Sequence, residues 1–130
     1  MKIEHIALNV PDPNEMAAWY EAHLGMKTVK KLDEEPFTHF LADNSGDVML
    51  EIYRNPPDAV PKYPNMNPLQ LHLAFVSSTP AVDRDRLQLA GAAFVEEQQF
   101  EDGTHLVMMR DPWGVCIQLC KRGKGMLKSY

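Results

Sequence analysis

The strongest constraint on the fold is an internal repeat: four segments of the first half recur, in the same order, in the second half at an offset of 66 to 67 residues. Such a repeat indicates one supersecondary unit that is used twice. The chain has 130 residues, close to the commonest size of one domain. We therefore expect a single domain, residues 1–130, made of two similar modules. The matched segments are His5-Ile6-Ala7-Leu8 with His72-Leu73-Ala74-Phe75, His23-Leu24-Gly25 with Leu89-Ala90-Gly91, Thr38-His39 with Thr104-His105, and Leu50-Glu51-Ile52 with Ile117-Gln118-Leu119.

The first module, residues 1–53, is predicted to be βαβββ. Residues Ile3 to Val10 alternate between apolar and polar as in a strand. Asp12-Pro13 then supplies a helix N-cap and a proline suited to the first helical position, and Gly25 stands where a helix commonly ends. Three short strands are expected to follow, at about 26–33, 37–42 and 47–53.

The second module, residues 69–121, is predicted to repeat that order. A strand is expected from Leu69 to Val76, a helix from Thr79-Pro80 to just before Gly91, and strands at about 93–100, 104–110 and 114–121. The linker 54–68 holds five of the ten prolines and is expected to be extended rather than helical, and residues 122–130 form a basic tail. The predicted fold class is α+β: two tandem βαβββ modules that form a cupped, mostly antiparallel mixed sheet, with the helices on its outer face.

Charge and hydropathy exclude several kinds of partner. The net charge is −5, and residues 1–120 carry −9 because four basic and no acidic residues lie after position 120, which disfavours nucleic acid. Apolar runs are only a few residues long, so neither a membrane span nor a signal peptide is expected. Cys116 and Cys120 lie on one predicted strand, too far apart for a disulfide. These features predict a cytoplasmic protein that binds a small molecule.

Four polar residues share the face that strand parity turns away from the helices. His5 and Glu51 oppose the apolar residues of their strands in the first module, and His72 and Gln118 do so in the second. Imidazole nitrogens with carboxylate or amide oxygens suit a divalent first-row metal, and ligands on separate strands leave room for water or substrate. A lone strand histidine is usually structural. The repetition of the pattern, however, favours a metal site with His5, Glu51, His72 and Gln118 as ligands.

Other residues are candidates to line such a pocket. Asn9 shares the parity of His5, and Met49 and Tyr53 share that of Glu51. His39 and His105 are matched by the repeat, and we favour the interpretation that they are polar strand residues at a half-buried surface. All five are therefore candidate pocket-lining residues outside the ligand set.

The sequence resembles the vicinal oxygen chelate superfamily of glyoxalases, methylmalonyl-CoA epimerase, extradiol dioxygenases, fosfomycin-resistance proteins and metal-free bleomycin-resistance proteins. The resemblance covers the whole chain. It implies paired βαβββ modules around one divalent metal ion (Zn, Ni, Co, Mn or Fe), usually in a homodimer, with ligands from the first and last strands of each module. It rests on His5-Ile6-Ala7-Leu8-Asn9-Val10, Trp19-Tyr20-Glu21-Ala22-His23-Leu24-Gly25-Met26, Leu50-Glu51-Ile52, His72-Leu73-Ala74-Phe75, Asp111-Pro112-Trp113-Gly114 and Ile117-Gln118-Leu119.

The chain departs from the resemblance at Gln118, because glyoxalases and extradiol dioxygenases have a glutamate at that position. An amide cannot accept a proton near neutral pH, so Glu51 is the candidate catalytic group. The expected activity is that of a glyoxalase-like lyase or isomerase that stabilises negative charge beside a carbonyl, with the substrate chelated through two oxygens. Two alternatives stay open: an Fe(II)-dependent extradiol-type dioxygenase, and a metal-free small-molecule binder of the bleomycin-resistance type. The site could be built within one chain or across two.

Overall fold

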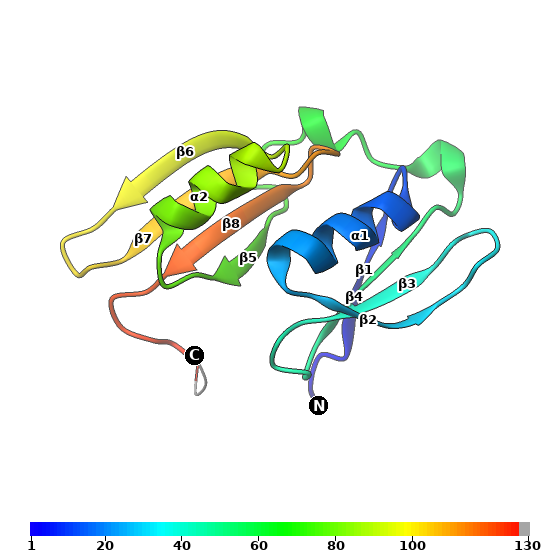
Figure 1. Ribbon diagram of the computed structural model, residues 1–130, viewed down its shortest axis with the longest axis horizontal. Coiled ribbons are helices and arrows are strands. Elements are labelled where there is room, and N and C mark those ends of the chain that lie inside the picture. The colour runs from blue at the N-terminus through cyan, green and yellow to red at the C-terminus, as the bar shows by residue number, and fades with distance from the viewer. Residues whose placement is uncertain (128–130) are drawn as a thin grey trace. The chain divides into compact units, whose positions relative to one another are not determined.

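A computed structural model describes residues 1–127, which form two compact units: the first is Met1–Pro61 and the second begins at Lys62. Both units have the predicted βαβββ order, so the α+β class and the tandem modules are confirmed (Figure 1). The first unit contains β1 (His5–Asn9), α1 (Pro13–Leu24), β2 (Lys27–Lys31), β3 (His39–Ala42) and β4 (Met49–Tyr53). The second contains β5 (Leu73–Val76), α2 (Pro80–Leu89), β6 (Ala93–Gln99), β7 (His105–Arg110) and β8 (Cys116–Lys121).

Each unit has an open four-stranded sheet with a helix on one face. The strand orders are β1-β4-β3-β2 and β5-β8-β7-β6, so the first strand of each module lies beside the last. That pair is parallel, and the other pairs are antiparallel. A parallel pair needs a long crossover, which the helix and the two middle strands of each module supply. The joining of both sheets into one cup stays a prediction.

The core of each unit lies between its helix and its sheet. In the first unit Met16 and Tyr20 of α1 are fully buried, as are Leu41 of β3 and Ile52 of β4. Their burial follows the alternation seen in the sequence, because Leu50 and Ile52 face inward while Glu51 faces the other way. The second unit buries Leu87 of α2 with Val107, Met109 and Ile117 in the same manner.

The ends of α1 follow the capping signals of the sequence. The side chain of Asp12 accepts a hydrogen bond of 3.2 Å from the backbone N–H of Glu15. Gly25 ends the helix with a φ of 70°, in the left-handed region that glycine adopts without steric cost. These two residues fix where α1 begins and ends, and thereby which of its side chains reach the sheet.

The structure corrects two expectations about the linker and its surroundings. The strand predicted from Leu69 to Val76 begins only at Leu73, because Asn67 and Gln70 hold residues 67–70 in a hydrogen-bonded turn. The segment 54–68 is not simply extended, since it contains 3-10 helices at Pro57–Ala59 and Tyr63–Asn65. In each, a proline at the start fixes φ at a helical value. The end of the predicted basic tail, residues 128–130, lies outside the described residues.

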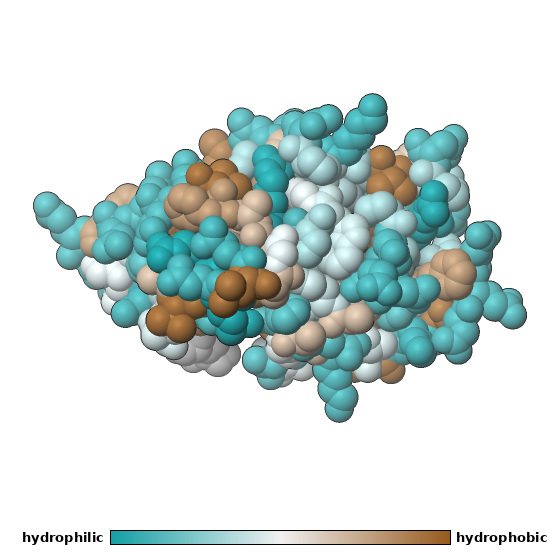
Figure 2. Space-filling view, turned by 45° about the horizontal axis from the view of Figure 1, so that its top comes forward, coloured by the Kyte–Doolittle hydropathy of each residue, from teal (hydrophilic) through white to brown (hydrophobic). Residues whose placement is uncertain are grey.

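The surface drawn in Figure 2 is mainly hydrophilic, with apolar groups in separate small patches. Scattered exposed apolar side chains are ordinary on a folded chain. Within residues 1–127, no helix is long and apolar enough to cross a bilayer.

Candidate functional site

His5 and Glu51 converge on the sheet face of the first unit that α1 leaves uncovered. His5 begins β1 and pairs with Met49, whereas Glu51 pairs with Ala7, so the two side chains are diagonal neighbours across a parallel strand pair. The Nε2 atom of His5 lies 3.2 Å from Oε2 of Glu51. The side chains are 39% and 20% exposed, which leaves the pair partly shielded but accessible. The predicted proximity of these two residues is therefore observed.

Glu4 holds the other ring nitrogen of His5. The carboxylate of Glu4 accepts a hydrogen bond from Nδ1. This hydrogen bond raises the pKa of His5 above its ordinary value, against some desolvation, and the charges of Glu4 and Glu51 act in the same upward direction. Because Nδ1 is occupied, Nε2 is the nitrogen that can receive a ligand.

An aromatic ring stands beside this pair. Phe40 pairs with Glu51 across β3 and β4, and its ring meets that of His5 edge to face, with centroids 6.4 Å apart and planes at 88°. Edge-to-face contact restricts rotation of the imidazole. Met49 pairs with His5 and is half-buried.

The second unit carries a comparable pair at matched positions. Gln118 of β8 pairs with Ala74, as Glu51 pairs with Ala7. His72 stands one residue before β5, and its Nδ1 donates to the backbone oxygen of Pro68 over 2.8 Å. A carbonyl can only accept, so Nδ1 donates, and Nε2 is the ring nitrogen that stays available to a ligand.

The spacing of one predicted donor pair suits a divalent metal ion. Two atoms that bind one ion at about 2.1 Å lie about 3.0–3.4 Å apart in octahedral or tetrahedral geometry, and His5 Nε2 and Glu51 Oε2 satisfy this. Both candidate histidines donate Nδ1–H to an acceptor, the arrangement that orients metal-binding imidazoles. Each unit offers one imidazole and one oxygen ligand. Within residues 1–127 no three His, Cys, Asp or Glu side chains gather closely enough to hold an ion.

Asn9 and Tyr53 lie at the far end of the same strand pair. They pair with each other at the last position of β1 and β4. The amide of Asn9 donates to the oxygen of Pro56 and accepts from the N–H of Asn55, both over 2.9 Å. Asn9 therefore fastens the chain that leaves β4, a structural use that its parity did not reveal. Tyr53 is half-buried and keeps the parity of Glu51.

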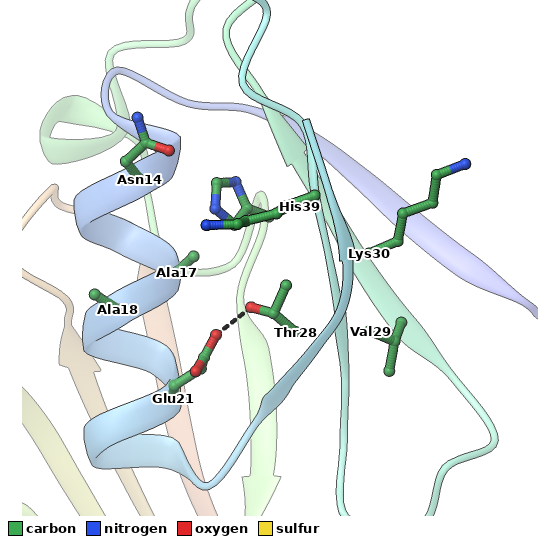
Figure 3. Close-up of a pocket in the computed structure, with 9 residues that line it drawn as sticks. Asn14, Ala17, Ala18, Glu21, Thr28, Val29, Lys30 and His39 are labelled. Carbon is green, nitrogen blue, oxygen red and sulfur yellow. Dashed lines mark hydrogen bonds between the residues drawn. The ribbon is translucent and has the colours of Figure 1, made fainter. Parts of the chain in front are cut away.

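His39 lies on the opposite face of the sheet from Glu51. It pairs with Ile52, whose side chain is buried under α1, and Figure 3 shows its imidazole directed toward that helix. The residue is 5% exposed, and its Nδ1 donates to the oxygen of Phe37 over 2.8 Å. The expectation that His39 lines the same pocket as Glu51 is therefore corrected.

His105 is likewise on the helix face of its sheet. It shares the face of Val107 and Met109, and it contacts Glu97, which also binds Arg84 of α2. The register shows why the repeat misled: Ile52 pairs with His39 while its counterpart Leu119, 67 positions later, pairs with Val107. The structural equivalent of His39 is thus Val107, and the matching Thr-His dipeptides do not occupy matching sites.

Sequence reasoning missed the residues that orient the two candidate ligands. The predicted strand began at Ile3, so parity placed Glu4 on the face opposite His5, whereas β1 begins only at His5. Pro68 belongs to a turn, for which strand parity gives no signal. Phe40 could have been found, because it alternates with the buried Leu41 in the strand next to Glu51.

Comparison with known proteins gives one family match. The family model of the "Glyoxalase/Bleomycin resistance protein/Dioxygenase superfamily" matches residues 2–119. Among curated proteins, no sequence matches this chain.

Solved structures share the fold at low sequence identity. A glyoxalase family protein from Bacillus cereus has a TM-score of 0.74 and 17% identity, with 94% of this chain and 93% of that chain covered. TnmS3, an antibiotic binding protein from Streptomyces sp. CB03234, has a TM-score of 0.72 and 18% identity, with 94% and 96% covered. Lactoylglutathione lyase from Agrobacterium tumefaciens has a TM-score of 0.67 and 20% identity, with 92% of each chain covered. At these identities the likeness concerns the fold alone.

Proposed function

Because this chain belongs to the glyoxalase/bleomycin resistance protein/dioxygenase superfamily, we propose that it is a metal-dependent lyase or isomerase that acts beside a carbonyl group of a small molecule. The observation that carries the proposal is the convergence of His5 Nε2 and Glu51 Oε2 at 3.2 Å. A purely structural ion pair would not need a matching imidazole and amide in the other module. His72 and Gln118 supply that match, with the ring of His72 oriented through Nδ1 as that of His5 is.

In this proposal His5, Glu51, His72 and Gln118 hold one divalent ion, within one chain or across a homodimer. The ion, when bound, supplies Lewis-acid chemistry that stabilises negative charge on a substrate oxygen. Phe40 and Met49 flank the ligand pair.

Glu51 is the group that moves the proton. It is the one anion of the proposed ligand set, and its carboxylate lies on the accessible face of the sheet, where a substrate C–H can approach. Gln118 at the matched position cannot accept a proton, so the two modules have different roles. The hydrogen bond from Nδ1 of His5 to Glu4 fixes the imidazole ring. The carboxylate of Glu51 lies next to Nε2, on the other side of that ring.

Metal content tests the first half of the proposal. Protein purified without chelators and reconstituted separately with Zn, Ni, Co, Mn and Fe should retain about one equivalent per chain of at least one metal. His5→Ala and His72→Ala should each lose most of that metal, since both modules contribute. His23→Gln is the matched control, because His23 stacks on Trp19 of α1, away from Glu51. Retention of metal by both alanine variants would refute the ligand assignment.

Proton exchange tests the role of Glu51. Nuclear magnetic resonance in D2O would follow deuterium incorporation beside the carbonyl of lactoylglutathione and of a methylmalonyl thioester. Wild type should catalyse exchange on at least one such compound, and Glu51→Gln should retain metal but lose exchange about 100-fold or more. Asp47→Asn is the control, an exposed acid that pairs with Lys2. Undiminished exchange in Glu51→Gln would exclude Glu51 as the base.

The same measurements distinguish the two other candidates. Metal content below about a tenth of an equivalent after every reconstitution would favour a metal-free binder of the bleomycin-resistance type. Oxygen uptake with catechols that requires ferrous iron would favour an extradiol-type dioxygenase.

A further inference from the structure

The first unit has a groove between α1 and β2, on the face of its sheet opposite Glu51. The groove has a volume of about 760 Å³, within the usual range of small-molecule sites. Figure 3 shows its polar side chains at two ends: Asn14 and His39 at the N-terminal end of α1, and Thr28 hydrogen-bonded to Glu21 at the other. We call it the α1–β2 groove; the residues that line it are Asn14, Ala17, Ala18, Glu21, Thr28, Val29, Lys30, Lys31 and His39, and in Figure 3 the side chains of Val29 and Lys30 point away from α1.

His39 presents an unused acceptor to this groove. The residue is 5% exposed, and its Nδ1–H is taken by the oxygen of Phe37. Within residues 1–127 its Nε2 has no hydrogen-bond partner, and no fully buried side-chain nitrogen or oxygen lacks one. Nε2 must therefore be reachable from the groove. A nearly buried imidazole whose Nδ1 is already bonded and whose Nε2 is open to the groove can accept a hydrogen bond from a ligand.

In the second unit, side chains bridge the equivalent space between helix and edge strand. Its helix carries Arg84 where α1 has Ala17, four residues after the first proline of the helix in both cases. Arg84 reaches Glu97 of β6 over 2.8 Å and closes the gap between helix and edge strand. Glu97 in turn contacts His105.

The first unit has replaced each partner of that bridge. Lys31 stands where the other sheet has Glu97, since each is the second residue after the irregularity in its edge strand. It pairs with His39, as Glu97 pairs with Val107. In the first unit α1 thus has Ala17 at this position, and the two strands have Lys31 and His39. Among the ion pairs of the described residues, Lys31 has no partner on α1, whereas Glu97 has Arg84 of α2.

We propose that the α1–β2 groove binds a small organic carboxylate that also carries a hydroxyl group, at a second site separate from Glu51. Lys31 and the side-chain amide of Asn14 donate to the carboxylate, and the hydroxyl donates to Nε2 of His39. Asn14 lies in the first turn of α1, whose exposed N–H groups add positive potential. Lys31 is 3.4 Å from Asp33 in an exposed ion pair, which a ligand can displace at little cost.

Glycolate and acetate provide matched probes, because they differ only in the hydroxyl. Titrations would be followed by ¹H–¹⁵N spectra, with the imidazole signals of His39 included, at pH 8 and in excess EDTA so that no metal ion recruits the probe. Glycolate should cause saturable shifts at His39 and along residues 14–31, and acetate should bind about tenfold or more weakly because it leaves Nε2 without a donor. Signals of His72 and Gln118 should stay unchanged, which separates this site from the proposed metal centre.

Two sets of variants complete the test. Ala17→Arg combined with Lys31→Glu rebuilds the bridge of the second unit and should weaken glycolate binding about tenfold or more. Lys30→Glu makes the same charge change as Lys31→Glu, but at the neighbouring residue. The side chain of Lys30 points away from α1 in Figure 3, so this variant should leave binding unchanged. His39→Phe keeps a buried ring without the acceptor and should abolish the preference for glycolate over acetate. Equal shifts from both probes, no shift at His39 in wild type, or undiminished binding in the rebuilt bridge would each overturn the proposal.

Discussion

Replacement of Gly114 by alanine should destabilise the second unit strongly. Gly114 has a φ of +90°, in a region that residues with a Cβ rarely adopt. A Cβ there would lie 2.5 Å from Cγ, 2.6 Å from the backbone nitrogen and 2.7 Å from Cδ of Pro64. Pro64 cannot easily retreat, because Arg110 binds the oxygens of Tyr63 and Met66, over 3.0 and 2.8 Å, together with the oxygen of Gly114.

The cost has two parts that a second glycine separates. The unfavourable φ costs an L-residue about 1–2 kcal/mol, and overpacking against fixed neighbours costs about 1–3 kcal/mol. Gly103 has a nearly identical φ of +88°, and the nearest atom to its Cβ would be Cα of Gly123 at 3.8 Å, an ordinary contact. Gly103→Ala should therefore lose only the first part. The gain of about 0.4–1 kcal/mol from restricting the unfolded chain is common to both variants and cancels in their difference.

Urea denaturation followed by circular dichroism would give the free energy of unfolding of both variants and the wild type. Gly114→Ala should be less stable than Gly103→Ala by about 1–3 kcal/mol. Equal stability of the two variants would show that the 62–66 segment yields readily. The close approach of Pro64 would then not constrain position 114.

Three further changes test smaller features. Glu4→Gln should lower the pKa of His5 toward its ordinary 6.5, and the imidazole proton shifts would show it. Because the folded-state pKa is raised, the contact stabilises the fold below about pH 6.5, and this stabilisation is lost as pH rises through the folded pKa. A larger loss of stability at pH 9 than at pH 6 would contradict the assignment. Asp12→Ala removes the acceptor for the N–H of Glu15 and should cost about 1 kcal/mol in urea denaturation, with Asp12→Asn nearly neutral. Burial raises the pKa of the Cys116 thiol, so a thiol reagent at pH 8 should label Cys116 much more slowly in the native protein than in urea, as peptide mass analysis would show.

The repeat and strand parity predicted the topology and one half of the candidate site. Alternation in β4 placed Glu51 opposite Leu50 and Ile52, and the offset of 67 carried the same logic to Gln118. Both signals depend on backbone geometry that a strand imposes on any sequence. Predictions from the repeat and from strand parity therefore hold wherever the chain forms a strand.

The errors arose where the chain leaves that geometry. His72 precedes its strand because the turn at Asn67 delays pairing, and its ring is set by the oxygen of Pro68 instead of by the pleat. The match of His39 with His105 failed because the connections between strands differ in length in the two modules, which shifts the register of β7 relative to β3. Loop length and side-chain orientation outside strands have no periodic signature in a sequence.

Because the first and last strands of each module pair in parallel, the two candidate ligands of a module are far apart in the sequence. His5 and Glu51 are brought together only after the helix and both middle strands of their module have been traversed, so no shorter fragment of the module contains the pair. The same closure unites β5 with β8. During synthesis, the donor atoms in each half assemble only with the final strand of that half, and affinity for a metal ion would report completion of the module rather than its beginning.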